Sequence, residues 1–171
     1  KSALVIALGL PVLLTSCDKD EDPVSNTITD VVVNNASFST LEAAVLKANL
    51  QTTLSGTGPF TVFAPNDAAF TASNFTSATL NSLSADSVSK ILLYHTIPAR
   101  ILAADVPAGP NAKVVTASGD SVFVTKNSNG VFINGIQVTS ADVTADNGVI
   151  HVIGRVLNPP IGNIVETAVA A

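Results

Sequence analysis

The chain has 171 residues, which suits one folded domain with appended segments. Hydrophobic residues make up 47% of it and charged residues only 12%, a balance that favours a neutral, secreted, β-containing protein over a cytosolic enzyme. The net charge of -5 argues against nucleic-acid binding, because such binding needs a cationic face. With one Cys, two His and one Tyr, the chain has few catalytic side chains and cannot form an internal disulfide.

The N-terminal segment is typical of an export signal. Lys1 precedes an apolar run over residues 3–14, which is too short to span a bilayer as a stable helix. The sequence Leu14-Thr15-Ser16-Cys17 follows and resembles the lipobox of bacterial lipoproteins. We therefore expect residues 1–16 to be a lipoprotein signal peptide and Cys17 to be the lipidation site. The alternative is an ordinary secretory signal with an incidental Cys.

An acidic tether is expected over residues 17–27. The run Asp18-Lys19-Asp20-Glu21-Asp22 is most simply a solvated linker. It also resembles the signal that sends some Bacteroidetes lipoproteins to the outer face of the outer membrane. We therefore expect a cell-envelope protein that is lipid-anchored and surface-exposed at the outer membrane, with a periplasmic or secreted location as the alternative. The run is not expected to bind a metal, because its carboxylates lack a fixed cage.

The first half of the domain is predicted to be mostly helical. Residues 28–33 indicate a short helix, and apolar residues recur at helical spacing over residues 39–48. A second major helix should begin at Ser84 or Asp86, either of which can cap it, and should end by Pro98.

One strand is expected between these helices. Residues 61–64 form a short apolar stretch that Pro65 stops. Asn66 can then cap a helical turn that returns Phe70 to the core.

Beyond Pro98 the apolar period changes to two, which predicts strands. The sequence Asn134-Gly135 favours the positive φ of a tight hairpin. The last strand is apolar on both faces and is followed by Pro159-Pro160. Helices early and a strand meander late predict an α+β domain. The expected strands are residues 114–116, 121–126, 131–133, 136–143 and 149–153.

Three stretches occur in an order that resembles the fasciclin domain, an extracellular adhesion and ligand-binding module. They are residues 58–70, the sequence Leu92-Leu93-Tyr94-His95, and residues 148–160. The resemblance covers residues 28–160 and implies a β-wedge or sandwich with helices packed along one edge. Its structural motif residues map onto Phe63, Pro65, Asn66, Asp67, Phe70, His151 and Arg155.

The chain departs from the family pattern near Arg155. Gly154 stands where the family commonly has an Asp, and Asn158 stands where an apolar residue is common. The missing acid puts a local ion pair of Arg155 in doubt. Residues 163–170 echo residues 27–34, and we expect residues 161–171 to begin a truncated second fasciclin repeat. The alternative is a C-terminal helix that caps the single domain.

His95 is the most tempting catalytic candidate, with Asp67 as its orienting partner. It lies on an apolar helical face, however, so we expect it to be buried, neutral and hydrogen-bonded. The resemblance links Tyr94 and His95 to receptor contact in animal members, which makes them a weak partner-binding prediction. His151 should be edge-exposed or locally paired. No metal-ligand spacing occurs, and no cofactor is expected.

We therefore expect a lipid-anchored cell-envelope fasciclin module, not an enzyme. It would mediate adhesion by contact with extracellular matrix, polysaccharide or a cell-surface protein, and would meet the membrane only through its lipid. One alternative is a carrier of a small apolar ligand such as a carotenoid. A third hypothesis is a hydrolase that uses His95.

Overall fold

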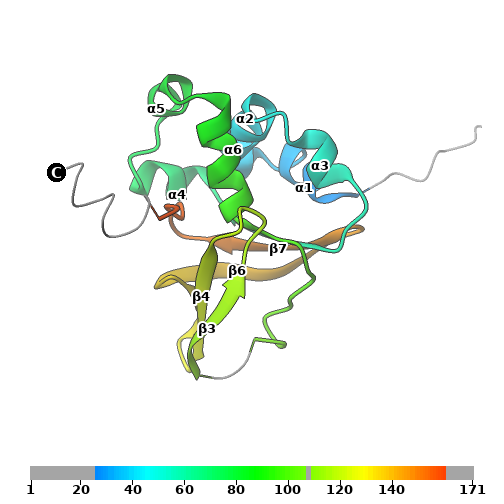
Figure 1. Ribbon diagram of the computed structural model, residues 1–171, viewed down its shortest axis with the longest axis vertical. Helices are drawn as coiled ribbons and strands as arrows, with labels where there is room; N and C mark the ends of the chain where they lie inside the picture. Colours follow the sequence, from blue (N-terminus) through cyan, green and yellow to red (C-terminus); the bar gives the residue numbers. More distant parts are fainter. Residues whose placement is uncertain (1–25, 107–108, 161–171) are drawn as a thin grey trace, which may run out of the picture.

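The computed structural model describes residues 26–106 and 109–160. Helices fill most of the first part of the chain, and strands fill the second part, as expected for an α+β domain (Figure 1). The helices are α1 (Ile28–Val33), the 3₁₀ helix η1 (Ala36–Phe38), α2 (Ser39–Lys47), α3 (Gln51–Ser55), α4 (Asp67–Ala72), α5 (Ser77–Ser82) and α6 (Ala85–Tyr94).

The described strands form one seven-stranded sheet in the order β2-β1-β7-β6-β5-β4-β3. β1 and β7 run parallel, and every other neighbouring pair is antiparallel. The predicted late meander is therefore present from β3 to β7, and β1 joins it from the first half of the chain. The strands are β1 (Phe60–Pro65), β2 (Thr96–Ile97), β3 (Gly109–Val115), β4 (Ser121–Asn127), β5 (Gly130–Ile133), β6 (Ile136–Ala145) and β7 (Gly148–Ile153).

Two of the three fasciclin-like stretches, residues 58–70 and residues 148–160, meet through the paired strands β1 and β7. Val62 on β1 lies opposite Ile150 on β7, and Phe63 lies opposite His151. Gly148 allows this close approach, since a Cβ there would lie 2.2 Å from the carbonyl oxygen of Phe60. These stretches therefore share one interior.

Apolar side chains cover both faces of the central strands. Along β1, Val62 and Ala64 belong to a cluster shared with the helices, whereas Phe63 belongs to a second cluster shared with β4 and β5. On β7, Ile150 joins the first cluster and Ile153 the second. This two-sided burial explains why both strands are apolar at most positions, as in parallel sheets.

The predicted helix starts agree with the structure. Thr27 caps α1 and forms a capping box with Asp30. Asn66 caps α4 through a 2.8 Å bond from the Ala69 amide to its Oδ1 atom, and Ser84, not Asp86, caps α6. Helix α6 ends at Tyr94, well before Pro98, because the next residues extend into β2 beside β1.

Several elements differ from the prediction. Helix α5 and strand β2 were not predicted, because α5 is mostly polar with Leu80 as its buried residue and β2 has only two residues. Strand β3 begins earlier than residue 114, and its register shifts between Gly109 and Ala112, which obscures the period of two. The predicted signal peptide, Cys17 and the second repeat lie outside the described residues.

No helix within residues 26–106 and 109–160 combines the length and apolar character that a membrane-spanning helix needs.

Candidate functional site

Tyr94 and His95 end helix α6 inside the protein. Tyr94 is 3% exposed and His95 is 2% exposed. The Tyr94 hydroxyl donates to the Ser121 carbonyl oxygen at 3.2 Å and accepts a 2.9 Å bond from Nδ2 of Asn134. Tyr94 therefore ties α6 to β4 and to the β5–β6 turn, and it offers little surface to a partner.

His95 is held by main-chain groups at both ring nitrogens. Nδ1 lies 2.7 Å from the Ile91 carbonyl oxygen, and Nε2 accepts a 2.9 Å bond from the Leu157 amide. Because the carbonyl can only accept and the amide can only donate, the ring is neutral with its proton on Nδ1. Burial lowers the pKa of His95 to about 4, although the bond to Ile91 acts in the opposite direction. The expected buried, neutral and hydrogen-bonded His95 is confirmed.

The carboxylate of Asp67 caps the N-terminus of helix α2. Its carboxylate accepts 2.8 Å hydrogen bonds from the Ser39 hydroxyl and from the Thr40 amide, at the first two residues of α2. Phe38, in the N-cap position, has no side-chain cap to offer, so Asp67 supplies one from α4. Partial burial acts to raise the pKa of Asp67, but together the hydrogen bonds from Thr40 and Ser39 hold it below its ordinary value.

The pairing of His95 with Asp67, which was raised only for the hydrolase alternative, is therefore contradicted. Both ring nitrogens of His95 are hydrogen-bonded to main-chain atoms of Ile91 and Leu157. The carboxylate of Asp67 is hydrogen-bonded to the first two residues of α2. The hydrolase hypothesis required Asp67 to orient the imidazole and one nitrogen to reach a substrate, and neither condition is met.

His151 is an interior residue, so an edge-exposed position is wrong. It lies on β7 between β1 and β6, and its ring stacks on Phe63 with a 5.9 Å separation of the ring centres. Nε2 donates to the Ile101 carbonyl oxygen at 2.9 Å, and Nδ1 accepts a 3.2 Å bond from the Asp142 amide. The side chain thus fastens the loop after β2 to the sheet.

The remaining motif residues have structural positions. Phe63, Pro65 and Phe70 are buried. Arg155 is exposed, and it forms no ion pair with any residue within the described ranges. This agrees with the doubt raised by Gly154. Across the same described ranges, no three His, Cys, Asp or Glu side chains are grouped so that they could hold a metal ion.

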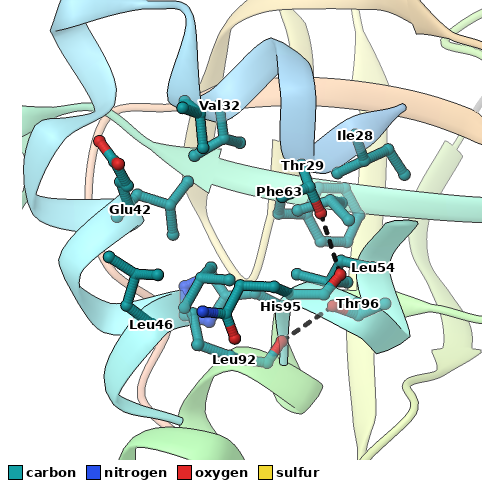
Figure 2. Close-up of a pocket in the computed structure, with 15 residues that line it drawn as sticks. Ile28, Thr29, Val32, Glu42, Leu46, Leu54, Phe63, Leu92, His95 and Thr96 are labelled. Carbon is teal, nitrogen blue, oxygen red and sulfur yellow. Dashed lines mark hydrogen bonds between the residues drawn. The ribbon is translucent and has the colours of Figure 1, made fainter. Parts of the chain in front are cut away.

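An apolar cavity lies between helices α1, α2, α3 and α6 and strand β1 (Figure 2). It encloses about 20 Å³, and Figure 2 shows Ile28, Leu54 and Phe63 among its lining residues. Val33 and Leu46 also line it and are each 49% exposed. Since drug-sized ligands occupy pockets of roughly 300–1,000 Å³, a carotenoid would enter only if the helices separated.

A larger and more polar cleft of about 400 Å³ lies on another part of the surface. The loop of residues 55–59, the β6–β7 turn of residues 146–148, and Arg100 form its lining. Neither Arg100 nor residues 146–148 were predicted from the sequence to be part of a site. No local pattern indicates a site built from three segments so far apart in the chain.

Asn147 holds the segments around this cleft together by hydrogen bonds. Its Oδ1 atom accepts a 2.9 Å bond from the Ile28 amide, and Nδ2 donates to the carbonyl oxygens of Leu54 and Gly56 at 2.7 and 2.8 Å. Its main-chain oxygen accepts from the Phe60 amide at 3.0 Å. The available signal was the sequence Asn-Gly, which indicates a turn but not these partners.

Comparison with known proteins finds relatives that share most of this sequence region. The family model described as the fasciclin domain matches residues 36–159. Protein sll1483 of Synechocystis is 44% identical over 139 residues, which cover 79% of this chain and 74% of that protein. Transforming growth factor-beta-induced protein ig-h3 of Sus scrofa is 33% identical over 147 residues, which cover 86% of this chain but only 21% of that protein.

The fold also matches a solved structure. The structure of a FAS1 domain pair from the insect cell adhesion molecule fasciclin I aligns with a TM-score of 0.61 over 81% of this chain and 50% of that chain. Its sequence identity is 20%, so this likeness concerns the fold alone. The chain thus spans about half of that structure and about a fifth of ig-h3. By its sequence match and its fold, the chain belongs to the fasciclin domain family.

Proposed function

We propose that this protein is a lipid-anchored adhesion module of the cell envelope. The observation that supports it most is the fasciclin match over residues 36–159, in a family whose solved members include a cell adhesion molecule. The interior geometry is compatible with a binding module, because the ring nitrogens of His95 and His151 are all hydrogen-bonded to main-chain groups. Binding would then use the exposed surface of the domain.

The lipid anchor is proposed from the sequence. Cys17 is the chain's only cysteine and stands at the end of a lipobox-like stretch, before the acidic run. The bacterial relatives include proteins of Synechocystis and Mycobacterium bovis, so they lend no support to a Bacteroidetes-like source. Display on the outer face of the outer membrane therefore rests on the acidic run alone.

The anchor is tested by expressing the full chain in a bacterial host that lipidates exported proteins. A Cys17→Ala variant should leave the membrane fraction and lose incorporation of a labelled fatty acid. A Ser16→Ala variant is the matched control, since it keeps the thiol and a small neighbour. Membrane retention of Cys17→Ala equal to that of the parent chain would reject the anchor.

The proposed partners are extracellular matrix, polysaccharide or a cell-surface protein. The test compares cell attachment to surfaces coated with the folded protein, with the heat-unfolded protein, and with nothing. Attachment that requires the folded protein supports adhesion. Equal attachment to coated and bare surfaces across several cell types and matrices contradicts it.

A carrier of a small apolar ligand is the second candidate. The apolar cavity and the exposed Val33 and Leu46 that line it favour this function, whereas the volume of about 20 Å³ opposes it. Native mass spectrometry of protein purified without detergent is the direct test. A bound lipid or pigment would support the carrier, and ligand-free, colourless protein would count against it.

A further inference from the structure

The polar cleft beside Arg100 has the size and lining of a binding site. Its volume of about 400 Å³ falls within the range of small-ligand pockets. The cleft is separate from Tyr94 and His95, which do not line it. Its lining side chains are short hydroxyl, carboxyl and amide groups around one guanidinium, and Pro59 is the only apolar side chain among them.

Arg100 supplies an uncommitted cation. The side chain is exposed, and within the described residues it makes no hydrogen bond or ion pair. A guanidinium presents a planar fork of donors that matches a carboxylate in a bidentate geometry. Its natural ligand group is therefore a carboxylate or a phosphate.

Asp146 places an acceptor in the same cleft. Its Oδ2 atom accepts a 2.7 Å bond from the Asn26 amide, so the carboxylate is held in place. A ligand that carried only negative charge, such as sulfate or phosphate, would meet this carboxylate as well as Arg100. A ligand with one carboxylate and several hydroxyl donors satisfies both groups, because its hydroxyls can donate to Asp146.

The walls of the cleft are fixed before any ligand arrives. Asn147 joins the turn to Ile28, Leu54 and Gly56. A Cβ at Gly58 would lie 1.9 Å from the Asn147 carbonyl oxygen, so the loop and the turn are in close main-chain contact. A preorganised site loses less conformational entropy on binding.

A peptide is a poorer match for this cleft. Peptides are commonly bound along an unpaired sheet edge or by an apolar anchor in a groove. β1 and β7, the strands beside the cleft, both lie inside the sheet, and the lining has no apolar groove.

We infer that this cleft binds a uronic-acid unit of an acidic polysaccharide. Arg100 pairs with the sugar carboxylate, and Asp146 accepts hydrogen bonds from the sugar hydroxyls. The inference rests on the proposed adhesion function and specifies its polysaccharide partner. With a single arginine in the site and a net charge of -5 on the chain, each unit binds weakly, and several displayed copies would be needed for firm attachment.

The test is a calorimetric or NMR titration of the full chain with oligogalacturonate, with neutral oligogalactose and with inorganic sulfate. Oligogalacturonate should bind, and an Arg100→Ala substitution should weaken that binding about tenfold or more. Arg100→Lys should restore it only partly, because Lys keeps the charge without the fork. Arg155→Ala, which removes the other exposed arginine, should leave binding unchanged. Unchanged thermal unfolding of both alanine variants is the folding control.

The inference is overturned if neutral oligogalactose or sulfate binds as tightly as oligogalacturonate, or if Arg100→Ala binds like the parent chain. Failure of the wider adhesion function is a separate result. Adhesion that survives in Arg100→Ala while no uronate binds removes only the inference. Uronate binding without any cell attachment removes only the adhesion proposal.

Discussion

Asp67 connects the start of helix α4 to the start of helix α2. Its carboxylate bonds to Ser39 and Thr40, whose helix lacks a cap of its own. An Asp67→Ala substitution should therefore lower the free energy of unfolding by about 1 kcal/mol, the usual loss when a helix cap is removed. Asp67→Asn keeps an acceptor and should lose less. Urea denaturation at pH 7 measures both changes.

The control for Asp67 is Asp86, which also lies in the first turn of a helix but is exposed. Asp86→Ala should change stability by only a few tenths of a kcal/mol. Because the pKa of Asp67 is lowered in the folded protein, its contribution to stability is fully present above the ordinary carboxyl pKa and is lost as the pH falls below that value and through the lowered pKa of the folded state. Equal losses from Asp67→Ala and Asp86→Ala would contradict the capping role.

His95 should make the fold sensitive to acid. Its pKa falls from 6.5 to about 4 on folding, so between these values the unfolded chain binds more protons. The contribution of His95 to stability is therefore complete above pH 6.5 and is lost as the pH drops towards 4. The full loss is about 3 kcal/mol from the size of the shift. Urea denaturation at pH 7 and pH 4.5 measures it.

The matched variants for His95 are His95→Gln and His151→Gln. Removing the ring at position 95 should reduce the difference in stability between pH 7 and pH 4.5, whatever it does to stability at pH 7. His151→Gln should retain the part of that difference due to His95. If His95→Gln kept the whole acid-dependent loss, the buried neutral imidazole would not be its cause.

At the scale of elements, the Asn147 side chain connects segments that lie far apart in the sequence. One amide side chain bonds to the first residue of α1 and to two carbonyl oxygens at the end of α3. Asn147→Ala should lower stability by about 2–4 kcal/mol, because it leaves several main-chain groups without partners. Hydrogen exchange should show lost protection first in α1 and α3, ahead of β4.

Asn129→Ala is the control for Asn147. Asn129 is exposed in the β4–β5 turn, where its main-chain atoms form its hydrogen bonds. This variant should unfold within about 0.5 kcal/mol of the parent chain. Uniform loss of protection over the whole domain in Asn147→Ala, with no preference for α1 and α3, would argue against a local connecting role.

The elements show where sequence reasoning succeeds. Caps such as Thr27, Asn66 and Ser84 act on amides within three residues, so a local pattern identifies them. The apolar strands around Val62 and Ile150 were also predictable, because burial on both faces leaves a continuous apolar run. Helix α5 was missed because it is short and mostly polar, and its single buried residue, Leu80, makes no apolar period.

At the scale of the whole molecule, the polar cleft could not be predicted from local sequence patterns. Asn147 and Ile28 are 119 residues apart, and Arg100 lies far in sequence from both walls of the cleft. Each residue is unremarkable in its own segment. Only the sheet order, which places β1 beside β7, brings residues 55–59 to residues 146–148. The predicted motif residues were found by resemblance, and most of them support the interior.

This arrangement predicts how variants of Tyr94 behave in an adhesion assay. The hydroxyl bonds to Ser121 and Asn134 inside the protein, so Tyr94→Phe should cost about 1–2 kcal/mol of stability and little else. Adhesion per folded molecule should stay at the parent level. Tyr94→Ala removes the ring from the second apolar cluster and should cost about 3–5 kcal/mol. Its adhesion should fall in proportion to its folded fraction.

The decisive measurement is adhesion plotted against folded fraction for the parent chain and both Tyr94 variants over a range of temperatures. If Tyr94 acts through the fold, all points lie on one line. A fully folded Tyr94→Phe protein that fails to adhere would place the hydroxyl in direct contact with a partner. Such contact would require α6 to move away from β4, since the side chain is 3% exposed in the folded domain. The same plot therefore separates a surface role of the Tyr-His pair from a scaffolding role.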